Sequence, residues 1–206
     1  MAHDIDLSCR CGAVKYRVAE MTPQKLLGRG VCYCEDCQAF GHYLGAPDEM
    51  LDERGGTELF QIQPRYLDIL EGKEHIAAVR MSDRGPLRWY TACCNSPLGN
   101  SVPTRLVAFT GLIVRPGQLS DEDEAAIGGE RIAIFPDTAK GGPDPALKPA
   151  SIAGLMLKNM IQAIGALYIG AHLKTPYFRK DGKPIAEPKV LSEAERDGLL
   201  AKVRAG

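Results

Sequence analysis

The 206-residue sequence lacks the excess of positive charge that is usual in proteins that bind nucleic acids or membrane surfaces. Its 25 lysines and arginines oppose 26 aspartates and glutamates, which leaves a formal net charge of −1. A basic footprint is what attracts nucleic-acid phosphates and anionic lipids. We therefore expect neither a nucleic acid nor a membrane among the partners of this protein.

Nucleotide-binding motifs are also missing, and we expect no targeting signal. The first seven residues show no basic start followed by an apolar run, which is the pattern of a secretory signal. It has no Gly-rich phosphate loop, no dinucleotide fingerprint, no Ser/His/Asp pattern and no internal repeat. We expect a cytoplasmic protein, in a reducing compartment where disulfides do not persist.

Short apolar segments separated by glycine, proline and aspartate turns fill the first part of the chain. The clearest lies within residues 7–19, where Val14, Tyr16 and Val18 share one face of an alternating pattern. The other candidate strands are residues 26–34, 58–63, 66–70, 75–81, 87–91 and 106–114. This series predicts a mainly β core over residues 1–115.

The remaining segment, residues 116–206, predicts added helices and therefore an α+β protein overall. An acidic run from Ser120 to Glu124 suggests a short helix or a solvated turn. Ser192 and Glu195 have the spacing of a capping box that starts a final helix. We expect this extension to pack on the β core as part of one continuous globular unit.

Residues 151–173 form the most apolar stretch and are long enough to cross a bilayer. Lys158, Asn159 and Gln162 interrupt the stretch in its middle. A narrow polar stripe of this kind favours a helix that packs into a soluble core over a membrane span.

Seven cysteines carry the chemistry of the sequence. They form three tight groups: Cys9 with Cys11; Cys32 with Cys34 and Cys37; and Cys93 with Cys94. Clustered cysteines in a reducing compartment indicate metal binding or catalysis rather than disulfides. We predict that they bind zinc.

The middle group, with spacing C-x-C-x-x-C, is the most informative of the three. Three soft ligands within six residues leave the fourth position of a tetrahedral zinc to something else, which is typical of a reactive site. Three thiolates on Zn²⁺ give a net charge of −1, so this zinc should acidify a bound water less than one held by neutral imidazoles. Such a site suits an incoming thiol better than it suits hydrolysis.

The two outer groups predict a closed site. In an extended chain, side chains at i and i+2 share a face, so Cys9 and Cys11 can approach the sulfur spacing of roughly 3.8 Å that tetrahedral zinc requires. Adjacent cysteines tend to diverge, so we expect one of Cys93 and Cys94 to be a ligand and the other to be a ligand or a small buried residue.

These groups together resemble the glutathione-dependent formaldehyde-activating enzyme family, which includes centromere protein V. The resemblance rests on C-x-C-G at 9–12, C-x-C-x-x-C at 32–37 and an aromatic strand that ends in Cys94-Asn95-Ser96-Pro97-Leu98, and it covers roughly the first 110 residues. It implies a β-tent core of short antiparallel strands. It also implies two zinc ions, one structural and one catalytic.

Carried onto this chain, the resemblance places the structural zinc on Cys9, Cys11, Cys94 and Cys93, and the catalytic zinc on Cys32, Cys34 and Cys37. The family pattern has a cysteine where Thr91 stands and a glycine where Asn95 stands. Basic residues usually follow the middle group, but Gln38 and Ala39 follow it in this chain.

Two functions are therefore expected from the sequence. The first is a zinc-dependent carbon–sulfur lyase-like enzyme that acts on a small thiol adduct such as S-hydroxymethyl glutathione. The second is a non-catalytic zinc module whose C-terminal helices bind a partner protein, with the middle zinc closed by Cys93 or missing. An exchangeable fourth ligand at the middle zinc distinguishes the two functions, because the enzyme needs it and the module does not. The sequence gives no oligomeric state.

Residues near the cysteines supply further candidates with alternative roles. Glu35 and Asp36 are acid–base groups or solvated turn residues, and His42 is a fourth ligand, a base or an ordinary histidine. Trp89 and Tyr90 are expected to pack behind the metal. Three arginines are carboxylate-binding candidates or part of a solvated face: Arg80, Arg84 and Arg88.

Overall fold

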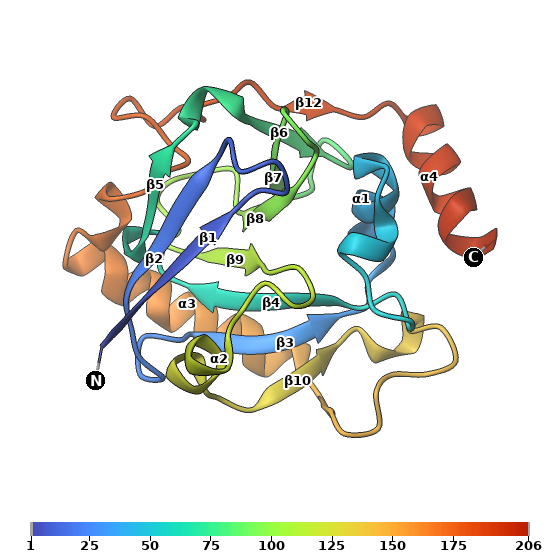
Figure 1. The fold of residues 1–206 in the computed structure, drawn as a ribbon, viewed down its shortest axis with the longest axis horizontal. Coiled ribbons are helices and arrows are strands. Elements are labelled where there is room, and N and C mark those ends of the chain that lie inside the picture. The colour runs from blue at the N-terminus through green and yellow to red at the C-terminus, as the bar shows by residue number, and fades with distance from the viewer. Residues whose placement is uncertain (1, 206) are drawn as a thin grey trace.

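The computed structural model describes residues 2–205 as an α+β fold with two β-sheets and four α-helices (Figure 1). A three-stranded sheet has the order β1-β2-β5, and a nine-stranded sheet has the order β11-β10-β3-β4-β9-β8-β7-β6-β12. The α+β class expected from the sequence is confirmed. The proposed division of the chain at residue 115 stays a prediction.

The three-stranded sheet is antiparallel and comprises β1 (His3–Ser8), β2 (Lys15–Met21) and β5 (Leu67–Glu71). Val14, Tyr16 and Val18 are buried, as the alternating pattern predicted. They share a hydrophobic core with Phe60 and Trp89 of the larger sheet. The small sheet therefore packs its apolar face against the large one.

In the nine-stranded sheet, the six central strands β3-β4-β9-β8-β7-β6 are antiparallel. Parallel strands are added at both edges, β10 and β11 beside β3 and β12 beside β6. Most of its strands match the sequence prediction, but β8 and the C-terminal strands β10 to β12 were not predicted. Its strands are β3 (Gly28–Cys32), β4 (Thr57–Ile62), β6 (Ile76–Arg80), β7 (Leu87–Thr91), β8 (Pro97–Ser101), β9 (Thr110–Ile113), β10 (Arg131–Ile134), β11 (Lys148–Pro149) and β12 (Lys189–Val190).

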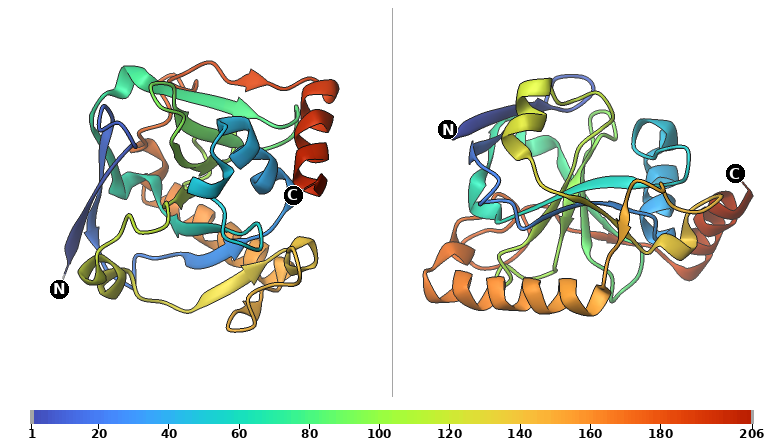
Figure 2. Two further views of the ribbon diagram at one scale, coloured as in Figure 1. Left: turned by 45° about the vertical axis from the view of Figure 1, so that its right-hand side comes forward. Right: turned by 90° about the horizontal axis from the view of Figure 1, so that it is seen from below.

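Helix α1 (Glu35–Leu44) follows β3 directly and was not predicted. It ends at Gly45, whose φ of 77° lies in the left-handed region that glycine adopts without strain. Helix α4 (Glu193–Ala205) begins with the predicted capping box, because Ser192 and Glu195 exchange backbone and side-chain hydrogen bonds. The two helices lie side by side (Figures 1 and 2).

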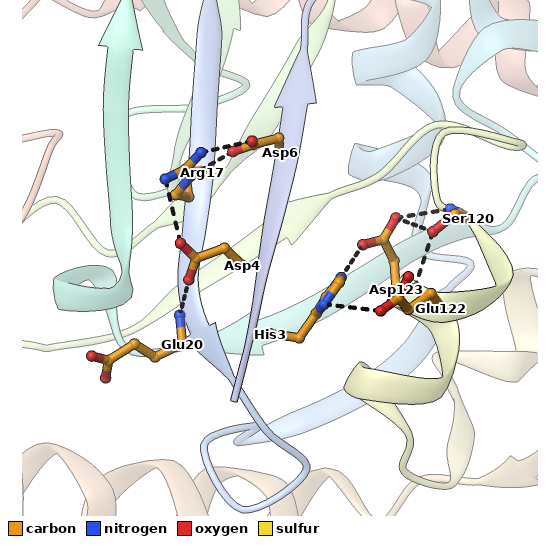
Figure 3. Close-up of polar contacts among 8 residues, drawn as sticks. All are labelled: His3, Asp4, Asp6, Arg17, Glu20, Ser120, Glu122 and Asp123. Atoms are coloured by element: carbon orange, nitrogen blue, oxygen red, sulfur yellow. Dashed lines mark hydrogen bonds and ion pairs between the residues drawn. The ribbon is translucent and has the colours of Figure 1, made fainter. Parts of the chain in front are cut away.

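Helix α2 (Asp121–Ile127) is held to the first strand by polar contacts (Figure 3). Ser120 and Asp123 form a capping box at its start, with the Asp123 backbone N–H donating to Ser120 Oγ over 3.1 Å. A ring nitrogen of His3 lies 2.8 Å from Asp123 Oδ1. These contacts join β1 to a helix about 120 positions later in the chain.

Helix α3 (Ile152–Tyr168) lies along the outside of the molecule, as Figure 2 shows in its right-hand view. The predicted helix exists, but its packing differs from the expectation, since Ala166 is its only buried residue. Most of its large apolar side chains are exposed. Within residues 2–205, no helix is both long enough and apolar enough to cross a membrane.

Candidate metal centres

Four sulfurs meet where the β1–β2 turn approaches the β7–β8 turn. Cys11 Sγ lies 3.6 Å from Cys9 Sγ and 3.5 Å from Cys93 Sγ. Cys93 Sγ lies 3.9 Å from both Cys9 Sγ and Cys94 Sγ. A tetrahedral zinc with Zn–S bonds of about 2.3 Å spaces its sulfurs about 3.8 Å apart. This four-cysteine group could therefore hold a metal ion such as zinc.

The first turn of the site is shaped by Gly12. Its φ of 77° lets the chain reverse, and its N–H donates to the carbonyl of Cys9 over 3.0 Å. The backbone N–H of Val14 then points at Cys9 Sγ over 3.3 Å. The turn thus brings the sulfurs of Cys9 and Cys11 together and supplies the Val14 N–H as a hydrogen-bond donor to Cys9.

The second turn brings in both adjacent cysteines. Asn95 adopts a left-handed φ of 55°, and its N–H donates to the Thr91 carbonyl over 2.7 Å. The sequence led us to expect the side chains of Cys93 and Cys94 to diverge, but both sulfurs lie within 4.8 Å of Cys9 and Cys11. Both sulfurs thus join the same group, directly before the tight turn at Asn95.

Hydrogen bonds favour the thiolate form of one cysteine in this group, Cys94. Burial raises the pKa of Cys94, but hydrogen bonds from Ser96 and Thr91 outweigh it and hold the pKa at about 5. The hydroxyl oxygens of Ser96 and Thr91 lie 3.2 Å and 3.4 Å from Cys94 Sγ. Burial and the neighbouring Cys11 instead raise the pKa of Cys93 to about 12. Metal ligation at Cys93 would therefore displace a proton.

A second group forms at the junction of β3 and α1. Cys32 ends β3, Cys34 is the residue before α1, and Cys37 lies in the first turn of that helix. The Sγ atoms of Cys32 and Cys34 are 3.5 Å apart, and all three sulfurs lie within 4.8 Å of one another. This three-cysteine group could also hold a metal ion such as zinc. Cys34 is half-buried, whereas Cys32 and Cys37 are buried.

No fourth ligand from residues 2–205 completes the three-cysteine group: no further cysteine, histidine or carboxylate places a ligand atom within 4.8 Å of all three sulfurs. Cys93 belongs to the other group, so the hypothesis that it closes this site is wrong. His42 lies in the last turn of α1, outside the group, where burial and nearby lysines lower its pKa.

The two acidic residues beside Cys34 serve the packing of α4. Asp36 Oδ1 lies 3.0 Å from Arg196, and Glu35 Oε1 lies 3.8 Å from Arg204. They are therefore engaged in ion pairs between helices, which neither of the expected roles included. These pairs fix α4 beside the helix that carries Cys37.

Arg88 lies beside the three-cysteine group and is 3% exposed. Its Nη1 lies 3.5 Å from Cys37 Sγ and 3.3 Å from Asn100 Oδ1. Hydrogen bonds from Cys32 and Cys34, together with the charge of Arg88, lower the pKa of the Cys37 thiol well below its usual range. The buried cation thus favours a thiolate at Cys37.

The alternation of β7 explains why Arg88 reaches the cysteines. Arg88 and Tyr90 share one face of the strand, and the intervening Trp89 occupies the other. Trp89 is fully buried and stacks on Tyr177 with ring centroids 4.6 Å apart, so its predicted packing role is confirmed. Arg80, in contrast, donates to the carbonyl of Gly85 away from the sulfurs. The sequence offered Arg88 only as one of three arginines.

Comparisons with known proteins identify a family but no activity. A search of curated proteins finds no match. A crystal structure of a Rhodobacter sphaeroides structural-genomics protein is similar over 61% of this chain and 97% of its own, with 18% identity and a TM-score of 0.37. Both cysteine groups are consistent with the zinc-bearing fold that the sequence resembles. The family model of DUF6151, described as a family of unknown function, matches residues 1–189, and the chain belongs to that family.

Proposed function

We propose that this protein is a zinc-dependent enzyme that acts on the carbon–sulfur bond of a small thiol adduct such as S-hydroxymethyl glutathione. The observation that carries the proposal is the incomplete ligand set of the three-cysteine group, in which Cys34 is half-buried. Cys32, Cys34 and Cys37 would hold the reactive zinc. The four-cysteine group would hold a second, structural zinc. The resemblance to the formaldehyde-activating family supports the same assignment.

The donor set favours a sulfur substrate. A zinc held by three thiolates offers one exchangeable position that suits a soft thiolate ligand. Its net charge of −1 would repel an anionic thiolate, but the Arg88 guanidinium beside Cys37 offsets that charge. The chain therefore supplies both the soft ligands and the cation that an incoming thiolate needs.

The reaction breaks the carbon–sulfur and hydroxyl O–H bonds and forms the second carbon–oxygen bond and a thiol S–H bond, without oxidation or reduction. In S-hydroxymethyl glutathione, the carbon–sulfur electron pair returns to sulfur while the hydroxyl proton leaves, which gives formaldehyde and the thiol. In the reverse direction the thiolate attacks the carbonyl carbon and the oxygen takes up a proton. The contribution of this chain is to stabilise the thiolate in both directions.

A surface hollow beside α1 contains Lys140, which would bind a carboxylate of a glutathione-like substrate. It has a volume of about 360 Å³ and adjoins the first turn of the helix. Lys140 and Gln38 line it together with the paired side chains of Glu35 and Arg204. Arginine and lysine are the usual partners of carboxylate groups.

The proposal is tested with Co²⁺ in place of zinc and with exchange NMR. Glutathione should change the ligand-field spectrum of one of the two bound cobalt ions, whereas S-methyl glutathione, which has no free thiol, should leave it unchanged. The zinc protein should accelerate the exchange between formaldehyde and S-hydroxymethyl glutathione, and Cys34→Ser should abolish that acceleration. A folded two-zinc protein that causes neither effect would refute the enzyme and favour the non-catalytic zinc module.

A further inference from the structure

The strongest unexplained feature outside the cysteine groups is the outward face of α3. Seven large apolar side chains of the helix are between 43% and 93% exposed. They are Met156, Leu157, Met160, Ile161, Ile164, Leu167 and Tyr168. We call this set the α3 face.

The helix turns its two amide side chains toward the protein. Asn159 and Gln162 are half-buried on the inner side, and Asn159 Oδ1 is buried without a hydrogen-bond partner in the described structure. Ile152, Leu155 and Ala166 provide the apolar contacts with the protein body. This orientation is the reverse of an ordinary surface helix, which buries its apolar stripe.

The area of the α3 face exceeds that of an ordinary surface patch. At roughly 150–200 Å² for each fully exposed large apolar side chain, the exposed fractions amount to about 700 Å². The largest apolar patch of a typical monomer is about 300–600 Å². A stable interface of standard size buries about 800 Å² on each partner. The α3 face, with the adjoining Ile169 and Leu173 also exposed, has the area that a dimer needs.

The spacing along the face suits a second helix with the same pattern. Leu157, Met160, Ile164 and Leu167 follow one another at intervals of three, four and three, which is the a/d spacing of a helix–helix seam. Such a seam is self-complementary, because a two-fold interface uses the same patch on both copies.

Charge favours a protein partner over a lipid surface. Helices that lie in a membrane interface carry several lysines or arginines on their polar face, whereas Lys158 is the only charged residue of α3. The nearby Lys174 and Lys25 are already paired with Asp68 and Glu20. Two copies of the face would also meet without charge repulsion.

We propose that the α3 face is the interface of a homodimer in which two α3 helices pack antiparallel about a two-fold axis. An axis between positions 162 and 163, near the middle of the α3 face, places Ile161 of one copy opposite Ile164 of the other. Leu157 and Tyr168 then meet at the two ends. This inference rests on the helix surface alone and is independent of the proposed activity.

The test is sedimentation equilibrium of the full chain at 1–100 µM, a range on the order of that in which weak dimers dissociate. The wild type should be a dimer, and the variant I161E/I164E should be a monomer with an unchanged zinc content and circular dichroism spectrum. The matched control L70E/L106E alters two leucines of similar exposure, 50% and 53%, outside α3, and it should remain dimeric.

A charge-complementation experiment tests the pairing of the two helices. Mixing I161E/I164E with I161K/I164K should restore a heterodimer, although each variant alone is a monomer. A monomeric wild type at 100 µM, a dimeric I161E/I164E or a mixture that stays monomeric would each overturn the proposal. A monomeric wild type that cosediments with phosphatidylglycerol vesicles would assign the face to lipid instead.

Discussion

Replacing Cys11 with serine separates the effect of a bound metal from the effect of packing. The Cys11 side chain is exposed, and its sulfur contacts the sulfurs of Cys9 and Cys93. Without a metal, an exposed substitution of this kind should change the free energy of unfolding by less than about 0.5 kcal/mol. Any larger loss therefore reports the ion that the four sulfurs hold.

The size of the loss follows from the ligand count. A structural zinc contributes roughly 10–16 kcal/mol in small zinc peptides, so one of four ligands corresponds to about 3 kcal/mol. For a chain of this size, 1 kcal/mol shifts the melting temperature by about 2–4 °C. We therefore expect Cys11→Ser to melt about 6–12 °C below the wild type in differential scanning calorimetry.

The control is the same pair of proteins after zinc removal. Once both are stripped by a chelator, the wild type and Cys11→Ser should melt at nearly the same temperature, because the side chain itself packs against little. If the zinc-loaded proteins also melt within about 1 °C of each other, the four sulfurs do not hold a stabilising metal and the reasoning is refuted.

Three further predictions concern positions that support the two sites and the fold. Arg88→Met should weaken zinc binding at the three-cysteine group by roughly 10–100-fold in a chelator competition and leave the other group unchanged, because the cation beside Cys37 is lost; equal weakening at both sites would contradict this. Asp123→Ala should cost about 1 kcal/mol at pH 7 in urea denaturation, since it removes the α2 capping box and the contact with His3. Burial raises the pKa of Asp123, but hydrogen bonds from Ser120 and His3 outweigh it and hold the pKa below its usual value. The stabilisation by Asp123 is therefore present above about pH 4 and should disappear as the pH falls further. A stability difference between wild type and Asp123→Ala that persists at pH 2 would argue against this. Gly12→Ala should lower the free energy of unfolding by about 1–2 kcal/mol, because the φ of 77° at this position is strained for alanine. No atom lies within 4 Å of the added Cβ, so the loss comes from the backbone alone. A variant that is more stable than the wild type would disprove that strain.

Local patterns predicted the parts of the fold that depend on local physics. The alternation through Val14, Tyr16 and Val18 predicted a buried strand face, because neighbouring side chains of a strand point to opposite sides. Ser192 and Glu195 predicted the start of α4, because a capping box acts within one turn. The cysteine spacing identified all seven residues that the two sites bring together.

Elements that depend on distant partners were not predicted. The strands β10 and β12 are short and pair in parallel with β3 and β6, whose residues lie more than 90 positions away in the chain. Helix α1 begins at Glu35, and the preceding Cys34 gives no side-chain cap, so no start signal marks the helix. Both sides of α3 carry apolar residues, and the pattern alone does not say which side faces the protein.

The role of Arg88 was likewise beyond the sequence. An arginine on an alternating strand is ordinarily solvated, and only the packing of α1 on the same face of β7 buries it beside Cys37. Glu35 and Asp36 illustrate the same point, since their partners lie on α4, some 160 positions later.

The most direct test of the central claim is the zinc content of the freshly purified protein, measured together with its X-ray absorption spectrum. We predict two zinc ions per chain and a mean sulfur coordination of about 3.5, midway between the four-cysteine and three-cysteine groups. Added glutathione should raise that mean toward four, because a thiol fills the remaining position. A single zinc per chain, or two zinc ions whose sulfur coordination does not respond to glutathione, would contradict the account.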